Sequence, residues 1–102
     1  MNKVVQDGKV AVLVSPGFGA GWYSWNTEYP ALLFDPELVE AVQNQDKEAL
    51  LKRAEEIAPN AYLGGAEQLS IYWVPEGTQF QITEYDGSEN MKTADEQTWI
   101  TA

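Results

Sequence analysis

The chain has 102 residues, about the size of one ordinary domain, and carries 16 acidic against 6 basic side chains, for a net charge of −10. Hydrophobic residues make up 44% and aromatic residues 12%, which excludes a disordered acidic tail. The sequence contains neither cysteine nor histidine, so disulfides, thiolate chemistry and every nucleophile–histidine pair are excluded. We therefore expect a protein that is not an enzyme and that holds no cofactor or metal.

The negative charge is concentrated in the second half of the chain. Residues 1–54 carry 7 acids and 5 bases, whereas residues 55–102 carry 9 acids and a single base, Lys92. Such a charge repels nucleic acid and anionic membrane surfaces, and it suits a basic partner protein. No apolar run is long enough for a membrane-spanning helix, and no signal-peptide pattern follows Met1. We expect a cytoplasmic protein that binds neither membranes nor nucleic acid directly.

The first predicted elements are two strands within residues 3–14. Asp7-Gly8 is a signal for a type I′ hairpin turn. Residues 10–14 are apolar on both faces, which is typical of a central strand covered on both sides. Residues 15–30 are predicted to form one long irregular loop, and its tryptophans and tyrosines argue against disorder.

The middle of the chain predicts a short edge strand over residues 31–34 and then two helices. Asp35 and Pro36 are typical of the N-cap and the first helical position, and Asp46 caps a second helix over residues 47–58. Pro59 ends that second helix.

The last part of the chain predicts strands. Alternation indicates a strand over residues 69–74, a tight turn, and a strand over residues 80–85 that pairs back onto it. Residues 88–96 are weakly patterned, and a final strand anchored by Trp99 is expected over residues 97–101. The fold class is therefore α+β: a single domain over residues 1–102, with a mostly antiparallel β-sheet and two short helices packed on one face.

The loop over residues 15–26 is the strongest candidate for a binding site. Its alternate glycines could turn successive backbone N–H groups toward an anion, and its aromatic rings could stack on a nucleobase. It matches neither the dinucleotide fingerprint nor a Walker A loop, and no lysine or arginine lies between Lys9 and Lys47 to neutralise a phosphate. In the alternative interpretation the glycines only permit a tight path and the aromatics fill the core. The predicted ligand-binding residues are Ser15, Gly17, Phe18, Gly19, Gly21, Trp22, Tyr23, Trp25 and Asn26.

A second candidate is the acidic segment of residues 84–89. Its carboxylates around a glycine turn could hold a hard cation, but the EF-hand pattern is absent, so we expect no metal. An ordinary hairpin turn on an acidic surface is the simpler interpretation. If this segment instead binds a basic partner protein, the predicted contact residues are Glu84, Tyr85, Asp86 and Glu89.

Several segments resemble a known group of proteins. Residues 12–26 (VLVSPGFGAGWYSWN) resemble the signature of small acidic proteins encoded by tailed bacteriophages and prophages. Later landmarks of the same group resemble residues 33–36 (LFDP), 64–65 (GG), 73–78 (WVPEGT) and 84–89 (EYDGSE), so the resemblance covers residues 9–89. It implies a viral accessory protein made inside a bacterial cell, and it implies no catalytic residue.

Two hypotheses about function follow. In the first, a counter-defence protein sequesters a small nucleotide-type signal in its glycine and aromatic loop. In the second, an acidic inhibitor binds a basic host protein, for example one that normally holds nucleic acid. A homo-oligomer held together by exposed loop aromatics is a further expectation, compatible with either hypothesis.

Overall fold

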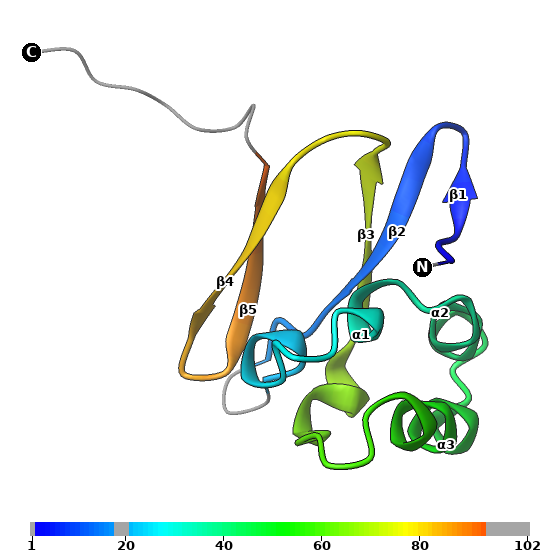
Figure 1. Cartoon of the computed structure of the whole chain (residues 1–102), viewed down its shortest axis with the longest axis vertical. Coiled ribbons are helices and arrows are strands. Elements are labelled where there is room, and N and C mark those ends of the chain that lie inside the picture. Colours follow the sequence, from blue (N-terminus) through cyan, green and yellow to red (C-terminus); the bar gives the residue numbers. More distant parts are fainter. Residues whose placement is uncertain (1, 18–20, 94–102) are drawn as a thin grey trace, which may run out of the picture.

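The computed structural model describes residues 2–17 and 21–93, and it shows an α+β fold with antiparallel strands in two sheets and three short α-helices (Figure 1). The predicted fold class is therefore confirmed, with one helix more than expected. The predicted strand over residues 97–101 lies outside the described residues. In chain order the elements are β1 (Val5–Gln6), β2 (Lys9–Val14), the 3₁₀ turn η1 (Tyr23–Trp25), α1 (Ala31–Phe34), α2 (Pro36–Gln43), α3 (Lys47–Ile57), the 3₁₀ turn η2 (Gly64–Gln68), β3 (Ser70–Pro75), β4 (Phe80–Tyr85) and β5 (Ser88–Thr93).

Strand β2 lies in the middle of a three-stranded sheet of order β1-β2-β3. The turn from β1 to β2 has positive φ at Asp7 (51°) and Gly8 (75°), which confirms the predicted type I′ turn. The alternate side chains of β2 enter two different apolar clusters. Ala11 and Leu13 pack among the helices, whereas Val12 and Val14 pack toward the β4–β5 hairpin. The prediction of a central strand covered on both faces is confirmed.

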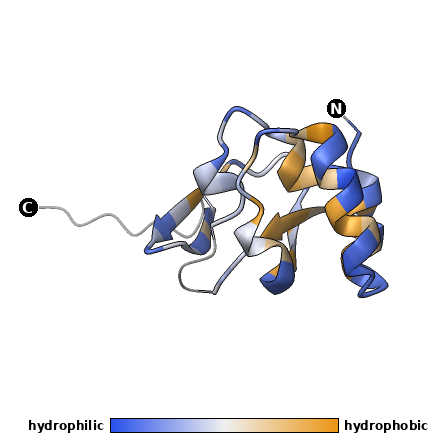
Figure 2. Ribbon diagram, turned by 90° about the horizontal axis from the view of Figure 1, so that it is seen from below, coloured by the Kyte–Doolittle hydropathy of each residue, from blue (hydrophilic) through white to orange (hydrophobic). Residues whose placement is uncertain are grey.

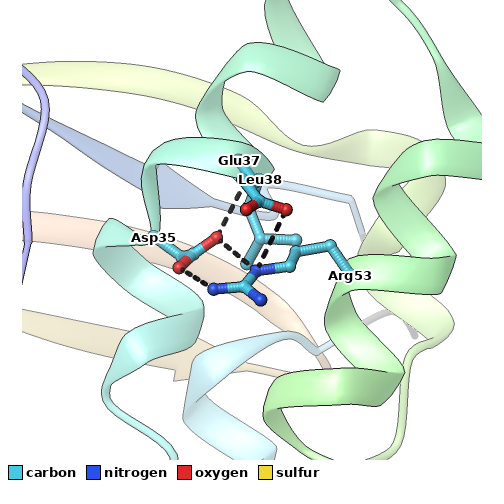
Figure 3. A network of polar contacts seen from close by, with 4 residues as sticks. All are labelled: Asp35, Glu37, Leu38 and Arg53. Atoms are coloured by element: carbon cyan, nitrogen blue, oxygen red, sulfur yellow. Dashed lines mark hydrogen bonds and ion pairs between the residues drawn. The ribbon is translucent and has the colours of Figure 1, made fainter.

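Helices α2 and α3 begin where their capping residues predict. The carboxylate of Asp35 accepts a hydrogen bond from the Leu38 backbone N–H, and that of Asp46 accepts one from Ala49. Asp35 also binds Arg53 of α3 through two hydrogen bonds of 3.0 and 2.9 Å, with Glu37 3.5 Å from the same guanidinium (Figure 3). One aspartate therefore caps α2 and ties it to α3. The apolar sides of these helices face the sheet and their polar sides face solvent (Figure 2).

The predicted edge strand over residues 31–34 is wrong, because this segment forms helix α1. Pro30 has φ −62°, and its carbonyl accepts a hydrogen bond from the Leu33 N–H. A run of four apolar residues has no period that distinguishes a helix from a strand. Tertiary burial decides here, since Leu32 packs with the helices while Leu33 packs in the cluster beneath the hairpin.

The predicted pairing of residues 80–85 with the preceding strand is also wrong. Strand β4 pairs with β5 in a separate two-stranded sheet, and β5 occupies part of the stretch that was expected to be weakly patterned. Phe80 and Ile82 of β4 pack against the second face of the β2–β3 pair. The chain leaves the first sheet after Pro75 because burial of these two side chains requires the hairpin to cover that face.

Candidate functional site

The loop after β2 is organised around a buried carboxylate, that of Glu89. This side chain has no exposed surface. Its Oε1 atom accepts a hydrogen bond of 3.0 Å from the Ser15 N–H. Its Oε2 atom accepts hydrogen bonds from the Trp22 N–H (2.9 Å), the Ser24 N–H (2.7 Å) and the Ser24 hydroxyl (2.6 Å). These donors replace the hydration that a carboxylate loses on burial.

The hairpin that carries Glu89 is attached to this loop by further contacts. The Glu89 N–H donates to the Ser15 carbonyl at 2.8 Å, and the Ser88 hydroxyl donates to the Pro16 carbonyl at 2.7 Å. The type I′ turn at Asp86 (φ 49°) and Gly87 (φ 83°) starts β5 directly before these residues. The turn thus places Glu89 beneath the loop, where its carboxylate acts as the anion that the loop binds.

From its alternate glycines, this loop was expected to bind an anion through backbone N–H groups. In the structure the N–H groups of Ser15, Trp22 and Ser24 bind Glu89 of the same chain. Trp22 is fully buried, and its indole N–H donates to the Leu32 carbonyl at 2.8 Å. Trp22 therefore belongs to the core, and its ring is closed to a ligand.

Two of the loop glycines make room for side chains of this protein. A Cβ atom on Gly17 would overlap the side chain of Gln68, and one on Gly21 would overlap the indole ring of Trp25. At Gly21 this close packing requires a glycine, whereas the flexible end of the Gln68 side chain can move away from a Cβ atom at Gly17. Phe18 and Gly19, which were also predicted to bind a ligand, lie outside the described residues.

Beside this loop, two aromatic rings lie together on the surface. Trp25 is 42% exposed and Tyr62 is 51% exposed, with ring centroids 5.0 Å apart and planes tilted by 44°. A Cβ atom on Gly64 would overlap the Tyr62 ring, as one on Gly21 would overlap the Trp25 ring. Each ring of this aromatic pair therefore lies in space that a side chain at the neighbouring glycine would fill.

Asn26 holds the two segments of the aromatic pair together. It is 6% exposed, and its side-chain amide donates to the carbonyls of Trp22 (2.7 Å) and Tyr62 (2.8 Å). Its side-chain oxygen accepts a hydrogen bond of 2.9 Å from the Tyr62 N–H. Asn26 was predicted to bind a ligand directly, but in this buried position it fixes the backbone beneath the exposed rings.

The acidic turn of residues 84–89 has an exposed part and a buried part. Glu84, Tyr85 and Asp86 are exposed, and Tyr85 is 77% exposed. Glu84 also accepts a hydrogen bond from the Gly87 N–H at 2.6 Å. Glu89, in contrast, cannot contact a partner, and its predicted surface position is wrong because its carboxylate is needed inside the loop. Within residues 2–17 and 21–93, no group of histidines, cysteines and carboxylates is placed to hold a metal ion.

Of the predicted ligand-binding residues that the structure describes, one has a large exposed ring, Trp25. Tyr23 is half-buried between the two apolar clusters, and Ser15 is fully buried. Tyr62, the second member of the aromatic pair, was not among the predicted site residues. The available signal in the sequence was a tyrosine two positions before the Gly64-Gly65 turn.

A groove of about 540 Å³ lies between α2, α3 and η2. At its border Lys47 and Glu67 form an exposed ion pair, and the hydrogen bond from Lys47 lowers the pKa of the Glu67 carboxyl. Among the residues lining this groove that the structure describes, none was predicted to bind a ligand or a partner.

Comparison with protein-family models, with curated proteins and with solved structures found no match to this chain. The resemblance to bacteriophage proteins therefore stays an expectation from the sequence. Within the described part of the chain, no helix has the length and apolar character needed to cross a membrane.

Proposed function

We propose that this protein is a non-catalytic binding protein that captures a basic partner protein through the Trp25–Tyr62 aromatic pair. The observation that carries the proposal is the exposure of two adjacent rings, fixed from beneath by Asn26, on a chain of net charge −10. Aromatic faces attract the cationic groups of arginine and lysine, and the overall charge attracts the same groups over a longer range.

The fixed backbone beneath the rings favours binding. Tyrosine and tryptophan are enriched among the residues that dominate protein–protein affinity, particularly where they lose little freedom on binding. The hydrogen bonds of Asn26 already fix the backbone of both segments. The entropy lost when a partner covers the aromatic pair is correspondingly small.

The exposed part of the acidic turn is the second surface that would contact the basic partner protein. Glu84 and Asp86 lie on the hairpin whose Ser88 and Glu89 bond to the loop carrying Trp25. The acids and the aromatic pair are thereby attached to one loop. In the setting that the sequence resemblance implies, such a protein would act inside a bacterial cell by occupying a basic host protein.

Sequestration of a nucleotide stays a prediction, and the geometry supports it less well. A nucleotide phosphate would have to displace Glu89 from the N–H groups of Ser15, Trp22 and Ser24, against the charge of the whole chain. The exposed rings of Trp25 and Tyr62 would still be free to stack on a base.

The test of the aromatic pair uses an oligo-arginine peptide as the probe. Trp25→Ala and Tyr62→Ala should each weaken binding by about tenfold, which is the scale of a partly desolvated cation–π contact. Val5→Ala, which shortens another exposed apolar side chain on β1, is the control and should leave the affinity unchanged. Titration calorimetry measures the affinity and circular dichroism verifies the fold. Equal affinities for all four proteins would refute the role of the pair.

The test of the acidic turn compares two double variants of equal charge. Glu84→Gln with Asp86→Asn should slow association with the same peptide, and the effect should be largest at low salt. Glu55→Gln with Glu56→Gln removes two exposed charges from α3 instead and should have a smaller effect. If both pairs slow association equally, only the total charge matters and the turn is not the contact surface.

A thermal-shift screen against linear and cyclic nucleotides decides the competing hypothesis. A ligand at 100 times its Kd adds about 2.7 kcal/mol to the free energy of unfolding, which raises Tm by several degrees for a domain of this size. A shift with a nucleotide that Trp25→Ala abolishes, together with no binding of the peptide, would replace the present proposal by nucleotide sequestration.

A further inference from the structure

We propose that the protein binds a small aromatic carboxylate in a cleft between β4 and the segment that carries η1 and α1. The described residues that line this cleft include none from the Trp25–Tyr62 aromatic pair and none from the acidic turn. Binding here is therefore separate from the capture of a basic partner protein and does not depend on it. Three observations support the site: the rings that line it, the contacts that hold its walls, and two lysines beside it.

The cleft is lined mainly by aromatic and aliphatic side chains. Its volume is about 500 Å³, within the range of small-molecule sites, and Tyr23, Phe34 and Phe80 contribute rings to it. The rings of Phe34 and Phe80 meet edge to face, with centroids 6.1 Å apart and planes at 73°. Another ring placed among them would gain the same offset or edge-to-face contacts in addition to apolar burial. The cleft therefore suits a planar aromatic ring better than an aliphatic group of the same size.

The walls of the cleft belong to the folded core. Tyr23 lies in η1, and the next residue, Ser24, binds Glu89 through both its N–H (2.7 Å) and its hydroxyl (2.6 Å). Leu33, on the α1 side of the cleft, is 5% exposed and shares an apolar cluster with Phe80 of β4. The cleft is thus formed before a ligand enters, which lowers the entropy lost on binding.

Two lysines lie beside the cleft. The Nζ atom of Lys3 is 4.4 Å from the centroid of the Phe34 ring. An ammonium group has three N–H donors, so it can contact this ring and bind a carboxylate at the same time. Lys92 of β5 pairs with Gln81, which lines the cleft, so the two side chains lie side by side on one face of the hairpin. Among the described residues, no ion pair includes either lysine.

The charges around the cleft favour a ligand with one negative charge. The whole chain has a net charge of −10, which opposes anions at long range, and this opposition grows with the charge of the ligand. At physiological ionic strength exposed charges are largely screened beyond about 8 Å, so the lysines beside the cleft act more strongly than distant acids. A single carboxylate gains from these lysines while it keeps the long-range repulsion small. A carboxylate attached to an aromatic ring therefore matches both the lining and the charge of the cleft.

An NMR titration of the unaltered chain with three matched probes tests the ligand class. Benzoate should shift the ring signals of Tyr23, Phe34 and Phe80. Benzamide lacks the charge and should bind about fivefold more weakly, the upper value for an exposed ion pair. Cyclohexanecarboxylate lacks the aromatic ring and should also bind about fivefold more weakly. Equal affinity of benzoate and either analogue, or no shift of these ring signals, would overturn the proposal. So would ring signals that change with protein concentration alone, because a second copy of the chain would then cover the cleft.

Variants that each remove one positive charge test the position of the site. Lys3→Gln and Lys92→Gln should each weaken benzoate binding by about twofold to fivefold and leave benzamide binding unchanged. Lys52→Gln removes the same charge from the exposed side of α3 and should keep the affinity for benzoate. Equal losses in all three variants would show that only the total charge matters, and unchanged affinity in both Lys3→Gln and Lys92→Gln would likewise overturn the site.

Phe80→Leu tests the contribution of the rings. This change keeps an apolar side chain in the cluster beneath the hairpin but removes one ring from the cleft. The preference for benzoate over cyclohexanecarboxylate should therefore shrink, and an unchanged preference would contradict the role of the rings. Circular dichroism verifies the fold of each variant. If Phe80→Leu does not fold, the lysine variants still decide the question, because they change exposed positions.

Discussion

The carboxylate of Glu89 is fully buried, and backbone and hydroxyl donors from the loop after β2 bind it. Burying an ionised carboxylate costs several kcal/mol unless such hydrogen bonds replace its hydration. The same bonds satisfy the N–H groups of a loop that has little regular structure to satisfy them. The residue-scale role of Glu89 is therefore to set the path of the segment that presents Trp25.

Glu89→Gln should destabilise the protein by about 3 kcal/mol or more. An amide can accept on one side only, so its NH₂ group would face backbone donors, and buried unsatisfied groups cost about 1–3 kcal/mol each. Glu84→Gln is the matched control, because Glu84 pairs with Glu89 across the hairpin and is exposed. Urea unfolding gives both free energies. Equal values for the two variants would contradict the anchoring role.

At the scale of elements, Asp35 connects three pieces of structure. It follows α1 directly, caps α2, and binds Arg53 of α3. The hydrogen bond from Arg53 lowers the pKa of the Asp35 carboxyl below its ordinary value of 3.8 and outweighs the opposing effect of burial. A carboxyl whose pKa is lower in the folded state stabilises the fold above its unfolded-state pKa, and this contribution is lost as the pH falls through the lower, folded value.

Asp35→Asn should therefore reduce stability at neutral pH and flatten the loss of stability below about pH 4. Asparagine still caps α2, so the change isolates the contact with Arg53. Asp35→Ala removes the cap as well and should cost about 1 kcal/mol more. Thermal unfolding between pH 2 and 7 measures these effects, and parallel stability profiles for the unaltered protein and Asp35→Asn would disprove the ion-pair contribution.

At the scale of the whole molecule, β2 joins two apolar clusters. Leu50 belongs to the cluster of the helices and Val74 to the cluster beneath the hairpin, and both are 4% exposed. Adjacent residues of β2 enter the two clusters in turn, so loss of one cluster exposes the strand that supports the other. The described part of the chain should therefore unfold as one unit.

Leu50→Ala should lower the free energy of unfolding by about 2–5 kcal/mol, and Val74→Ala should lower it by a smaller amount. In both variants circular dichroism and tryptophan fluorescence should report one shared transition. Separate transitions in either variant would show that the two clusters unfold independently.

Several features of this protein could be predicted from the chemistry of a few neighbouring residues in the sequence. Asp35-Pro36 and Asp46 mark helix starts, and Asp7-Gly8 and Asp86-Gly87 mark turns, because each acts on backbone groups within a few residues. The uninterrupted apolar run of β2 likewise indicated a strand buried on both faces.

The remaining features were decided by tertiary structure. Distant parts of the chain decide whether residues 31–34 form a helix or a strand. They also decide which strand pairs with β4. Glu89 had the sequence character of a surface acid, and its burial depends on donors 65 to 74 positions away. The alternate glycines predicted a loop that binds an anion through their own N–H groups. In the structure the N–H groups of Ser15, Trp22 and Ser24 bind Glu89 of the same chain. Local patterns show which backbone groups need a partner, but only the folded chain brings the partner to them.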